Sequence, residues 1–182
     1  VALLALFGST RAAMCALEPP AGFLLNQEAV VGAAKAVTAA RFPDADNVLV
    51  DDHVMEAYEK DGTSVLWDDE YAKVLTEKGR RDSASHELMF DLNYGTSFVY
   101  RAEIIKPDGR VIPVDTAQYS RVMTEPGQMG SNIYDPNTKV LSFSLPGLEI
   151  GDLCHLVTCR VTSKARMPDT WSDYAVFEYD SP

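Results

Sequence analysis

Basic residues are scarce in this sequence of 182 residues, and their scarcity excludes one large class of function. There are 16 lysines and arginines against 27 aspartates and glutamates, which gives a formal net charge of -11. Proteins that bind nucleic acid show the opposite balance, because they neutralise phosphates with lysine and arginine. We therefore expect no nucleic-acid partner.

Long apolar runs and cysteines are also few. No stretch approaches the roughly 20 apolar residues that a membrane-spanning helix needs, so we expect no transmembrane span. The three cysteines form no C-x-x-C pair and no zinc-site spacing with histidine. Hydrophobic residues make up 46% and charged residues 24%, which together with the length is typical of one globular domain.

Catalytic motifs are absent as well. His86 and Glu87 begin like the H-E-x-x-H motif, but Phe90 stands where the second zinc-binding histidine must lie. No G-x-S-x-G motif or phosphate-binding glycine loop occurs. We therefore expect no enzyme activity, no catalytic or cofactor-binding residue and no metal ligand, and we expect His53 and His86 to lie on the surface.

The first 43 residues divide into two parts. Residues 1–7 are apolar and small residues follow up to Ala16, which is typical of a secretory signal peptide at 1–16, although its basic start is missing. The alternative is an apolar segment that packs on the domain. Residues 17–43 read as a linker and a helix over residues 26–41. A signal peptide implies an exported protein: periplasmic, envelope-associated or secreted.

From Asp44 onward the pattern is that of a β-protein. Apolar and polar residues alternate in runs at 48–58, 63–76, 96–106, 111–114, 139–145, 153–162 and 174–179, and residues 116–131 read as a long loop. Turn residues separate these runs, and those assigned a structural role are Gly79, Pro107, Asp108, Gly109, Pro146, Gly147 and Gly151. The prediction is mainly β: an antiparallel β-sandwich over residues 44–182 with one N-terminal helix, cut at its C-terminal end.

Two cysteines and a histidine share the run at 153–162. A five-residue offset places Cys154 and Cys159 on opposite faces of a strand, so we expect two free thiols rather than a disulfide. His155 follows Cys154 directly and therefore points away from it. We expect His155 to be a partly buried structural histidine rather than a catalytic base.

Acidic residues crowd into one segment. Ten of them lie between Asp44 and Glu70, with Lys60 as the only base. The hairpin turn at residues 60–62 folds Asp51 and Asp52 back opposite Asp68, Asp69 and Glu70. Clustered carboxylates are the ligands of Ca²⁺, so these five residues are the candidates for a calcium site. The interpretation we favour is a solvated edge whose charges prevent strand-to-strand aggregation.

An ordered string of motifs resembles a known family. The matching segments are residues 42–46, 73–79, 102–110, 132–134 and 146–152. They resemble the bacterial domain of unknown function found N-terminal to transglutaminase-like, papain-fold domains. The resemblance implies a β-rich, exported domain without catalytic residues of its own, and a downstream transglutaminase-like domain as partner.

Three functions follow as hypotheses. The first is a non-catalytic module that positions the downstream domain or binds a peptide, protein or glycan. The second is a Ca²⁺-dependent carbohydrate-binding or adhesion module, and the third is a thiol enzyme that uses Cys154 or Cys159. The aromatic residues that would supply a binding surface are Tyr94, Phe98, Tyr100, Tyr119, Tyr134 and Trp171.

Overall fold

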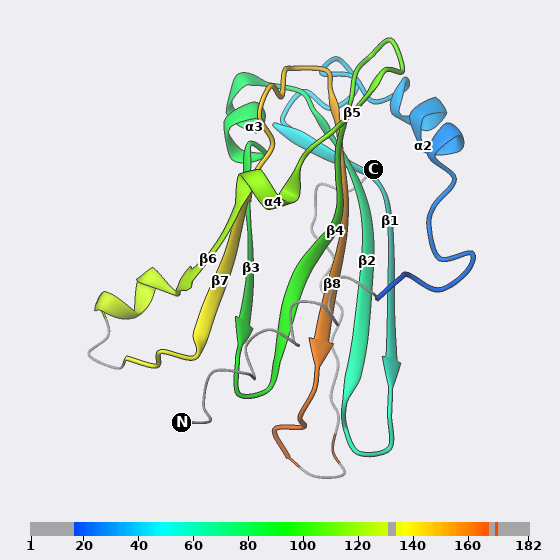
Figure 1. Cartoon of the computed structure of the whole chain (residues 1–182). Coiled ribbons are helices and arrows are strands. Elements are labelled where there is room, and N and C mark those ends of the chain that lie inside the picture. The colour runs from blue at the N-terminus through cyan, green and yellow to red at the C-terminus, as the bar shows by residue number, and fades with distance from the viewer. Residues whose placement is uncertain (1–16, 131–133, 168–169, 171–182) are drawn as a thin grey trace.

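Two antiparallel sheets pack face to face in the computed structural model of the chain (Figure 1), which describes residues 17–130, 134–167 and 170. The larger sheet has the strand order β1 (Asn47–Tyr58), β2 (Ser64–Val74), β8 (Leu153–Thr162), β4 (Gly95–Ile105) and β5 (Val111–Pro113). The smaller sheet has the order β3 (Ser85–Asp91), β7 (Thr138–Ser144) and β6 (Ser120–Thr124). The predicted antiparallel β-sandwich is thus confirmed.

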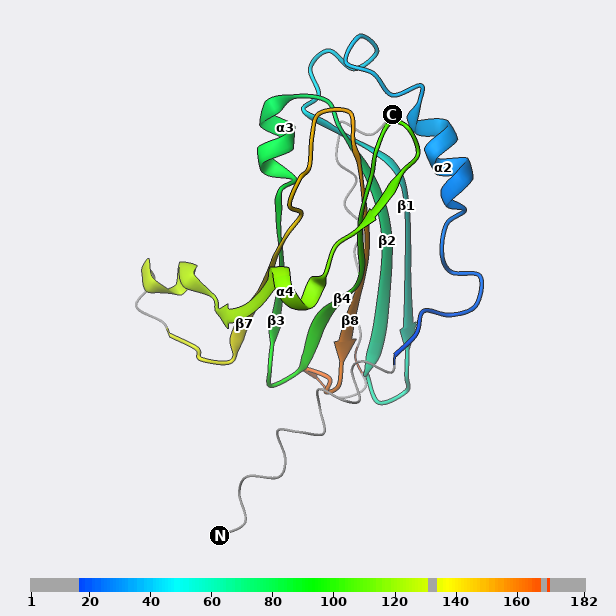
Figure 2. The same ribbon diagram turned by 45° about the horizontal axis from the view of Figure 1, so that its top comes forward.

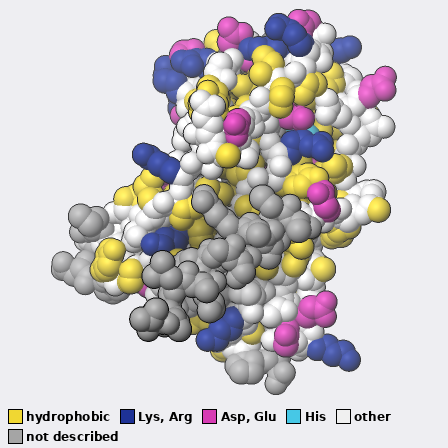
Figure 3. Space-filling model, viewed as in Figure 1, with side chains coloured by type: hydrophobic (Ala, Val, Ile, Leu, Met, Phe, Trp, Pro, Cys, Tyr) yellow, Lys and Arg dark blue, Asp and Glu magenta, His cyan; other side chains and the backbone are white. Residues whose placement is uncertain are grey.

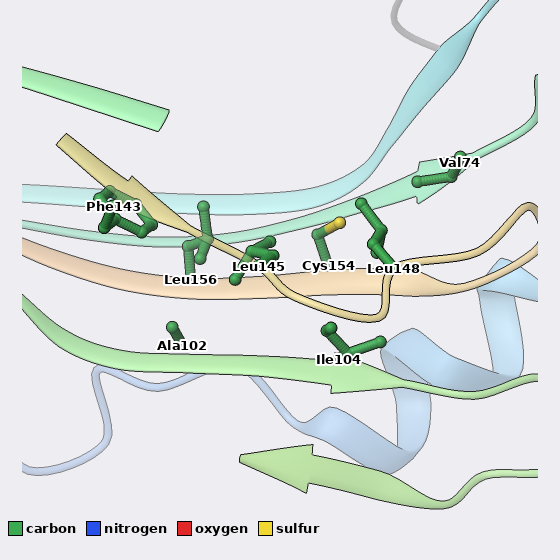
Figure 4. Packing of buried hydrophobic residues seen from close by; sticks show 8 residues of the cluster. All are labelled: Val74, Ala102, Ile104, Phe143, Leu145, Leu148, Cys154 and Leu156. Carbon is green, nitrogen blue, oxygen red and sulfur yellow. The ribbon is translucent and has the colours of Figure 1, made fainter. Parts of the chain in front are cut away.

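An apolar core joins the two sheets. Alternate residues of β4 and β8 point toward β7, and Phe143 of β7 and Leu145 just after it are each 2% exposed. The cluster shown in Figure 4 comprises Val74, Ala102, Ile104, Phe143, Leu145, Leu148, Cys154 and Leu156. Each large side chain buried there contributes roughly 1.5–3 kcal/mol, which makes this cluster a main source of stability.

The other face of the larger sheet is covered by the N-terminal segment, residues 17–46. Helix α2 (Gln27–Ala34) packs Val30 and Ala34 on this face, and Phe23 packs on Trp67. In Figures 1 and 2, α2 lies on the β1 side of the sheet, away from β6 and β7. The Lys73 ammonium donates a 2.7 Å hydrogen bond to the Ala34 carbonyl at the C-terminus of α2.

The predicted helix over residues 26–41 was too long. Asn26 caps α2 by accepting a hydrogen bond from the Ala29 amide, and the helix ends at Ala34. Beyond it, the carbonyl and hydroxyl of Thr38 both accept from the Arg41 amide. Such local side-chain bonds favour turns over helix, which explains the early end.

Two further elements correct the sequence-based prediction. Strand β3 was not expected, and residues 116–131 are not one loop but contain α4 (Thr116–Tyr119), β6 and a 3-10 turn (Pro126–Gly130). Both missed strands lie in the small sheet, where Met89 and Val122 are exposed and blur the alternation that marks a strand. The signal peptide at 1–16, the strand at 174–179 and Trp171 lie outside the described residues.

Most of the predicted turn residues lie in turns. Gly109, Gly147 and Gly151 have φ between 82° and 93°, which residues with a side chain rarely adopt. Pro107 and Asp108 form the turn between β4 and β5, which the Gly109 amide closes on the Lys106 carbonyl at 2.8 Å. Pro146 precedes Gly147 in the turn after β7.

Gly79 does not lie in a turn, as the sequence predicted, but within helix α3 (Glu77–Asp82). A Cβ atom at this position would meet the backbone oxygen of Asp46 at 2.1 Å. The same oxygen accepts hydrogen bonds from the amides of Leu75 and Thr76, so it cannot move away freely. Glycine is required here by the close approach of two backbones.

Replacement of Gly79 by alanine is therefore expected to destabilise the fold by about 2 kcal/mol or more, because either backbone must shift. The matched control is Gly32→Ala in α2, where a Cβ atom would meet nothing within 4 Å. That substitution is expected to stabilise the helix by about 0.5–1 kcal/mol. Urea unfolding of both variants measures the difference, and equal stabilities would contradict this account of Gly79.

Candidate functional site

Three ionisable side chains meet beneath the N-terminal segment. The Nε2 atom of His155 lies 2.9 Å from Oδ1 of Asp69, and its Nδ1 atom lies 2.9 Å from Oε2 of Glu103. The His155 and Asp69 side chains are 1% and 0% exposed, and that of Glu103 is 17% exposed. The strand order β2-β8-β4 creates the group, since β8 lies between the two strands that carry the carboxylates.

Hydrogen bonding fixes how many protons this group holds. Each of the two nitrogen–oxygen contacts needs one proton, because two lone pairs facing each other at 2.9 Å would repel. Imidazole is a stronger base than carboxylate, so both protons lie on His155. The group is then an imidazolium between two carboxylates, with a net charge of -1.

The group also ties down the N-terminal segment. The second oxygen of Asp69 accepts a 2.8 Å hydrogen bond from the Leu25 amide, and Tyr71 stacks on the His155 ring with centroids 4.0 Å apart. Burial, and then the charges of Asp69 and Glu103, raise the pKa of Tyr71. A general base needs a nitrogen lone pair that a substrate can reach, and His155 offers none.

The two cysteines of the described chain are free and buried. Cys154 belongs to the core between the sheets, whereas Cys159 packs with Trp67 on the opposite face. Burial raises the pKa of each thiol to about 12. A nucleophilic cysteine needs a lowered pKa and access to substrate, and neither residue has them.

The five acidic candidates are divided between the two faces of the sheet. Asp52 pairs with Glu70 and Val54 with Asp68, so Asp52, Asp68 and Glu70 share the face toward β3. Asp51 and Asp69 share the other face, where Asp69 is held by His155. Among residues 17–130, 134–167 and 170, no three His, Cys, Asp or Glu side chains converge as a metal site requires.

Asp68 is the most perturbed carboxyl group of this set. Burial, followed by the charges of Asp52 and Glu70, raises its pKa to about 7. Its Oδ1 atom is buried and has no hydrogen-bond partner. At neutral pH the group is therefore poised between its neutral and charged forms, and a proton relieves its repulsion with Asp52 and Glu70.

The other two histidines are not simple surface residues, as was expected. His53 stacks on Phe23 and donates from Nδ1 to the Phe23 carbonyl at 2.7 Å. His86 stacks on Phe143 and donates from Nε2 to the Ser83 carbonyl at 3.0 Å, and burial lowers its pKa. Their aromatic partners come from distant segments, which the sequence does not reveal.

The aromatic candidates are scattered. Phe98 and Tyr100 pack edge-on against Trp67 in the core, with centroids 5.9 and 5.5 Å away. Tyr119 and Tyr134 are exposed, and Tyr94 borders a cavity. The five candidates that the structure describes form no single binding surface.

Charges of both signs mix at the α3 end of the molecule. Lys78 pairs with Asp46, and Arg80 pairs with Glu77 at 2.6 Å. Figure 3 shows basic and acidic side chains side by side over this end. The negative excess therefore does not make the whole surface anionic.

Two cavities lie between β3 and the larger sheet, and they are the candidate ligand site. The larger, of about 730 Å³, opens at the β3–β4 connection and includes Leu66, Tyr94 and Arg160 in its lining. The smaller, of about 210 Å³, lies further along β3 and is lined by Asp68, Glu70, His86, Glu87, Leu88, Phe143, Leu156 and Thr158. No pattern in the sequence predicts these cavities, because they depend on the unpredicted strand β3.

Comparison with known families identifies the chain. A model of the DUF3857 family, described as a domain of unknown function with a solved structure, matches residues 60–182. The chain therefore belongs to this family. A search of curated proteins gives no match.

Solved structures support the fold. A "putative protease" from Parabacteroides distasonis superposes with a TM-score of 0.59 at 12% identity, over 66% of this chain and 24% of that protein. This chain thus spans about a quarter of the length of that protein. A carbohydrate-binding module from the Clostridium thermocellum scaffoldin reaches a TM-score of 0.35 at 13% identity over 65% of this chain and 68% of its own, too low to support an argument. No helix among the described residues is long and apolar enough to cross a membrane.

Removal of the His155 ring tests its structural role. His155→Ala leaves two carboxylates buried without their donor, so we expect a loss of about 3–5 kcal/mol in the free energy of unfolding. The control Glu28→Gln, on the exposed side of α2, is expected to change it by less than about 0.5 kcal/mol. A loss below about 1 kcal/mol for His155→Ala would contradict the structural role.

Asp68 makes stability depend on pH. Between pH 4 and 7 the folded state holds a proton on Asp68 that the unfolded state has lost, because the pKa is about 7 against an ordinary 3.8. Stability should therefore fall as pH rises through this window and level off above it. For this partly exposed group we expect a fall on the order of 2 kcal/mol. Urea unfolding of Asp68→Asn should lack this component, and an unchanged pH profile would contradict it.

Proposed function

We propose that this chain is a non-catalytic module of a larger exported protein with a transglutaminase-like or peptidase-like domain, which the module positions. The observation that carries the proposal is the extent of the structural match to the Parabacteroides distasonis protein described as a protease. The match covers about two-thirds of this chain but only about a quarter of that protein. Such a ratio suits one accessory module among several domains. In that protein, and in the larger protein that we propose for this chain, the catalytic residues would lie outside the module.

The buried groups support a non-catalytic role. Both nitrogens of His155 are engaged, and the thiols of Cys154 and Cys159 lie in the core with a pKa of about 12. Catalytic groups need access and a pKa near the working pH. We accordingly propose no thiol chemistry for this chain.

The charge arrangement supports a module that works without Ca²⁺. Calcium takes six to eight oxygen ligands that surround one point, whereas strand alternation sends Asp51 and Asp69 to the opposite face from Asp52, Asp68 and Glu70. Asp68 can hold a proton instead of a cation. A Ca²⁺-dependent adhesion module therefore remains the less supported alternative.

Deletion in the full-length protein tests the positioning role. With residues 17–182 replaced by a flexible linker, we expect activity of the following domain on a protein substrate to fall at least about tenfold, because the module holds that domain in place. The module added as a separate chain should not restore the activity.

The control is the full-length protein with Glu28→Gln, which should retain its activity. Undiminished activity after deletion would contradict the proposal. A full-length reading frame in which no catalytic domain follows residue 182 would also contradict the proposal.

A further inference from the structure

The larger cavity lies at one end of the larger sheet. Its lining includes Tyr58 and Gly62 beside the β1–β2 turn, and Tyr94 and Gly95 where β3 passes into β4. In Figure 1 both turns lie at the lower end of the sheet. The volume of about 730 Å³ falls in the range of sites that hold small ligands.

An arginine without a partner lines this cavity. Arg160 belongs to the central strand β8, where it lies in register between Leu66 of β2 and Ser97 of β4. It is exposed, and its guanidinium forms no ion pair or side-chain hydrogen bond in the part of the chain that the structure describes. A guanidinium offers five N–H donors in a fork that fits a carboxylate. An anion that enters the cavity can therefore pair with Arg160 without breaking an existing ion pair.

The acidic groups of the cavity already have partners. The two carboxylate oxygens of Glu56 accept hydrogen bonds from the hydroxyls of Tyr58 at 2.5 Å and Ser64 at 2.7 Å. Asp91 lies 3.6 Å from the guanidinium of Arg166. Both carboxylates are thus held by groups other than Arg160.

Further positive charge lies beside the cavity. The Arg166 guanidinium lies 4.3 Å from the centroid of the Tyr94 ring, and the Lys164 ammonium lies 5.9 Å from it. With Arg160 this makes three cations, against two acids among the described residues of the lining. In a chain whose net charge is -11, such a local excess of positive charge favours an anionic ligand.

Exposed apolar side chains lie at the same cavity. Met89 is 56% exposed and Met167 is 62% exposed, and both belong to the lining together with Leu66 and Phe90. Apolar side chains that remain exposed around a cavity are typical of ligand sites, and methionine adapts to the shape of a bound group. The ligand should therefore carry an apolar group close to its anionic group.

A hydroxyl group completes the floor. Thr162 follows Arg160 by two residues, so it points to the same face of β8, and it lies directly opposite Ser64. A hydroxyl both donates and accepts hydrogen bonds, so it can bond to the N–H or the C=O of a peptide group. A fatty acid has no such group beside its carboxylate. The end of a peptide chain therefore matches this lining better than a fatty acid does.

We propose that the larger cavity binds the free carboxyl terminus of a peptide whose last residue is apolar. The terminal carboxylate pairs with Arg160, the last side chain packs on Leu66 and Met89, and the preceding peptide group bonds to the Thr162 hydroxyl. This inference goes beyond the positioning role and does not depend on it, because the chain itself forms the whole cavity lining named here.

The test is the affinity of the full chain for three pentapeptides of glycine and serine that carry a fluorescent label at the amino end. The first ends in leucine with a free carboxylate, the second is its carboxyl-terminal amide, and the third ends in serine with a free carboxylate. Fluorescence anisotropy should show the first peptide binding at least about tenfold more tightly than the amide, which lacks the charge. It should bind about threefold or more tightly than the serine peptide, which lacks the apolar side chain.

Variants locate the site. Arg160→Gln should weaken binding of the leucine peptide about tenfold and abolish the preference for carboxylate over amide, and Met89→Gln should weaken it about threefold. The matched control is Arg121→Gln on β6, an exposed arginine outside the cavity, which should bind as the unchanged chain does. Urea midpoints close to that of the unchanged chain establish that the variants are folded. Equal affinity for carboxylate and amide, or equal losses in Arg160→Gln and Arg121→Gln, would overturn the proposal.

Competition with octanoate separates a peptide end from a simple amphiphile. Octanoate has a carboxylate and an apolar chain but no peptide group, so it should displace the labelled peptide at least about tenfold less well than the unlabelled peptide does. Displacement at equal concentrations would overturn the assignment to a peptide terminus. No binding of any peptide, alongside impaired activity of the deletion protein, would refute the site and leave the positioning role intact.

Discussion

The fold depends on one buried interaction, the imidazolium of His155 held between Asp69 and Glu103. It joins the three central strands of the larger sheet through side chains, and Asp69 extends it to the Leu25 amide of the N-terminal segment. Buried charges persist only when they are paired and hydrogen-bonded, so neither neighbouring strand can leave β8 without exposing an unpaired charge. The interaction specifies strand order as well as contributing stability.

The consequence is a sheet whose two faces have different roles. One face is closed by the N-terminal segment, which packs Phe23 and α2 over the histidine and shields it from any substrate. The other face packs against the small sheet, which has three strands against five. Two cavities lie beside β3 on this face, and Asp68 and Glu70 line the smaller of them.

Local signals in the sequence predict most of the large sheet but not its polar contacts. Alternation located β8 within one residue and showed that Cys154 and Cys159 lie on opposite faces. It also predicted a partly buried His155, which is in fact fully buried, but Asp69 and Glu103 lie 86 and 52 residues away, and only the strand order brings them together. β3 was missed because Met89 is exposed where the pattern would favour a polar residue, and the two cavities beside β3 were missed with it. The sequence predicts a turn at Gly79, because a glycine required by the close approach of two backbones cannot be distinguished in a sequence from a glycine required by a turn.

Nitrogen NMR of the His155 ring tests the central claim, that this residue is a structural link rather than a base. The account predicts that at pH 7 both Nδ1 and Nε2 carry directly bonded protons that exchange slowly with water, since each is buried against a carboxylate. A neutral ring with one bare nitrogen, or protons that exchange as fast as those of an exposed histidine, would contradict it.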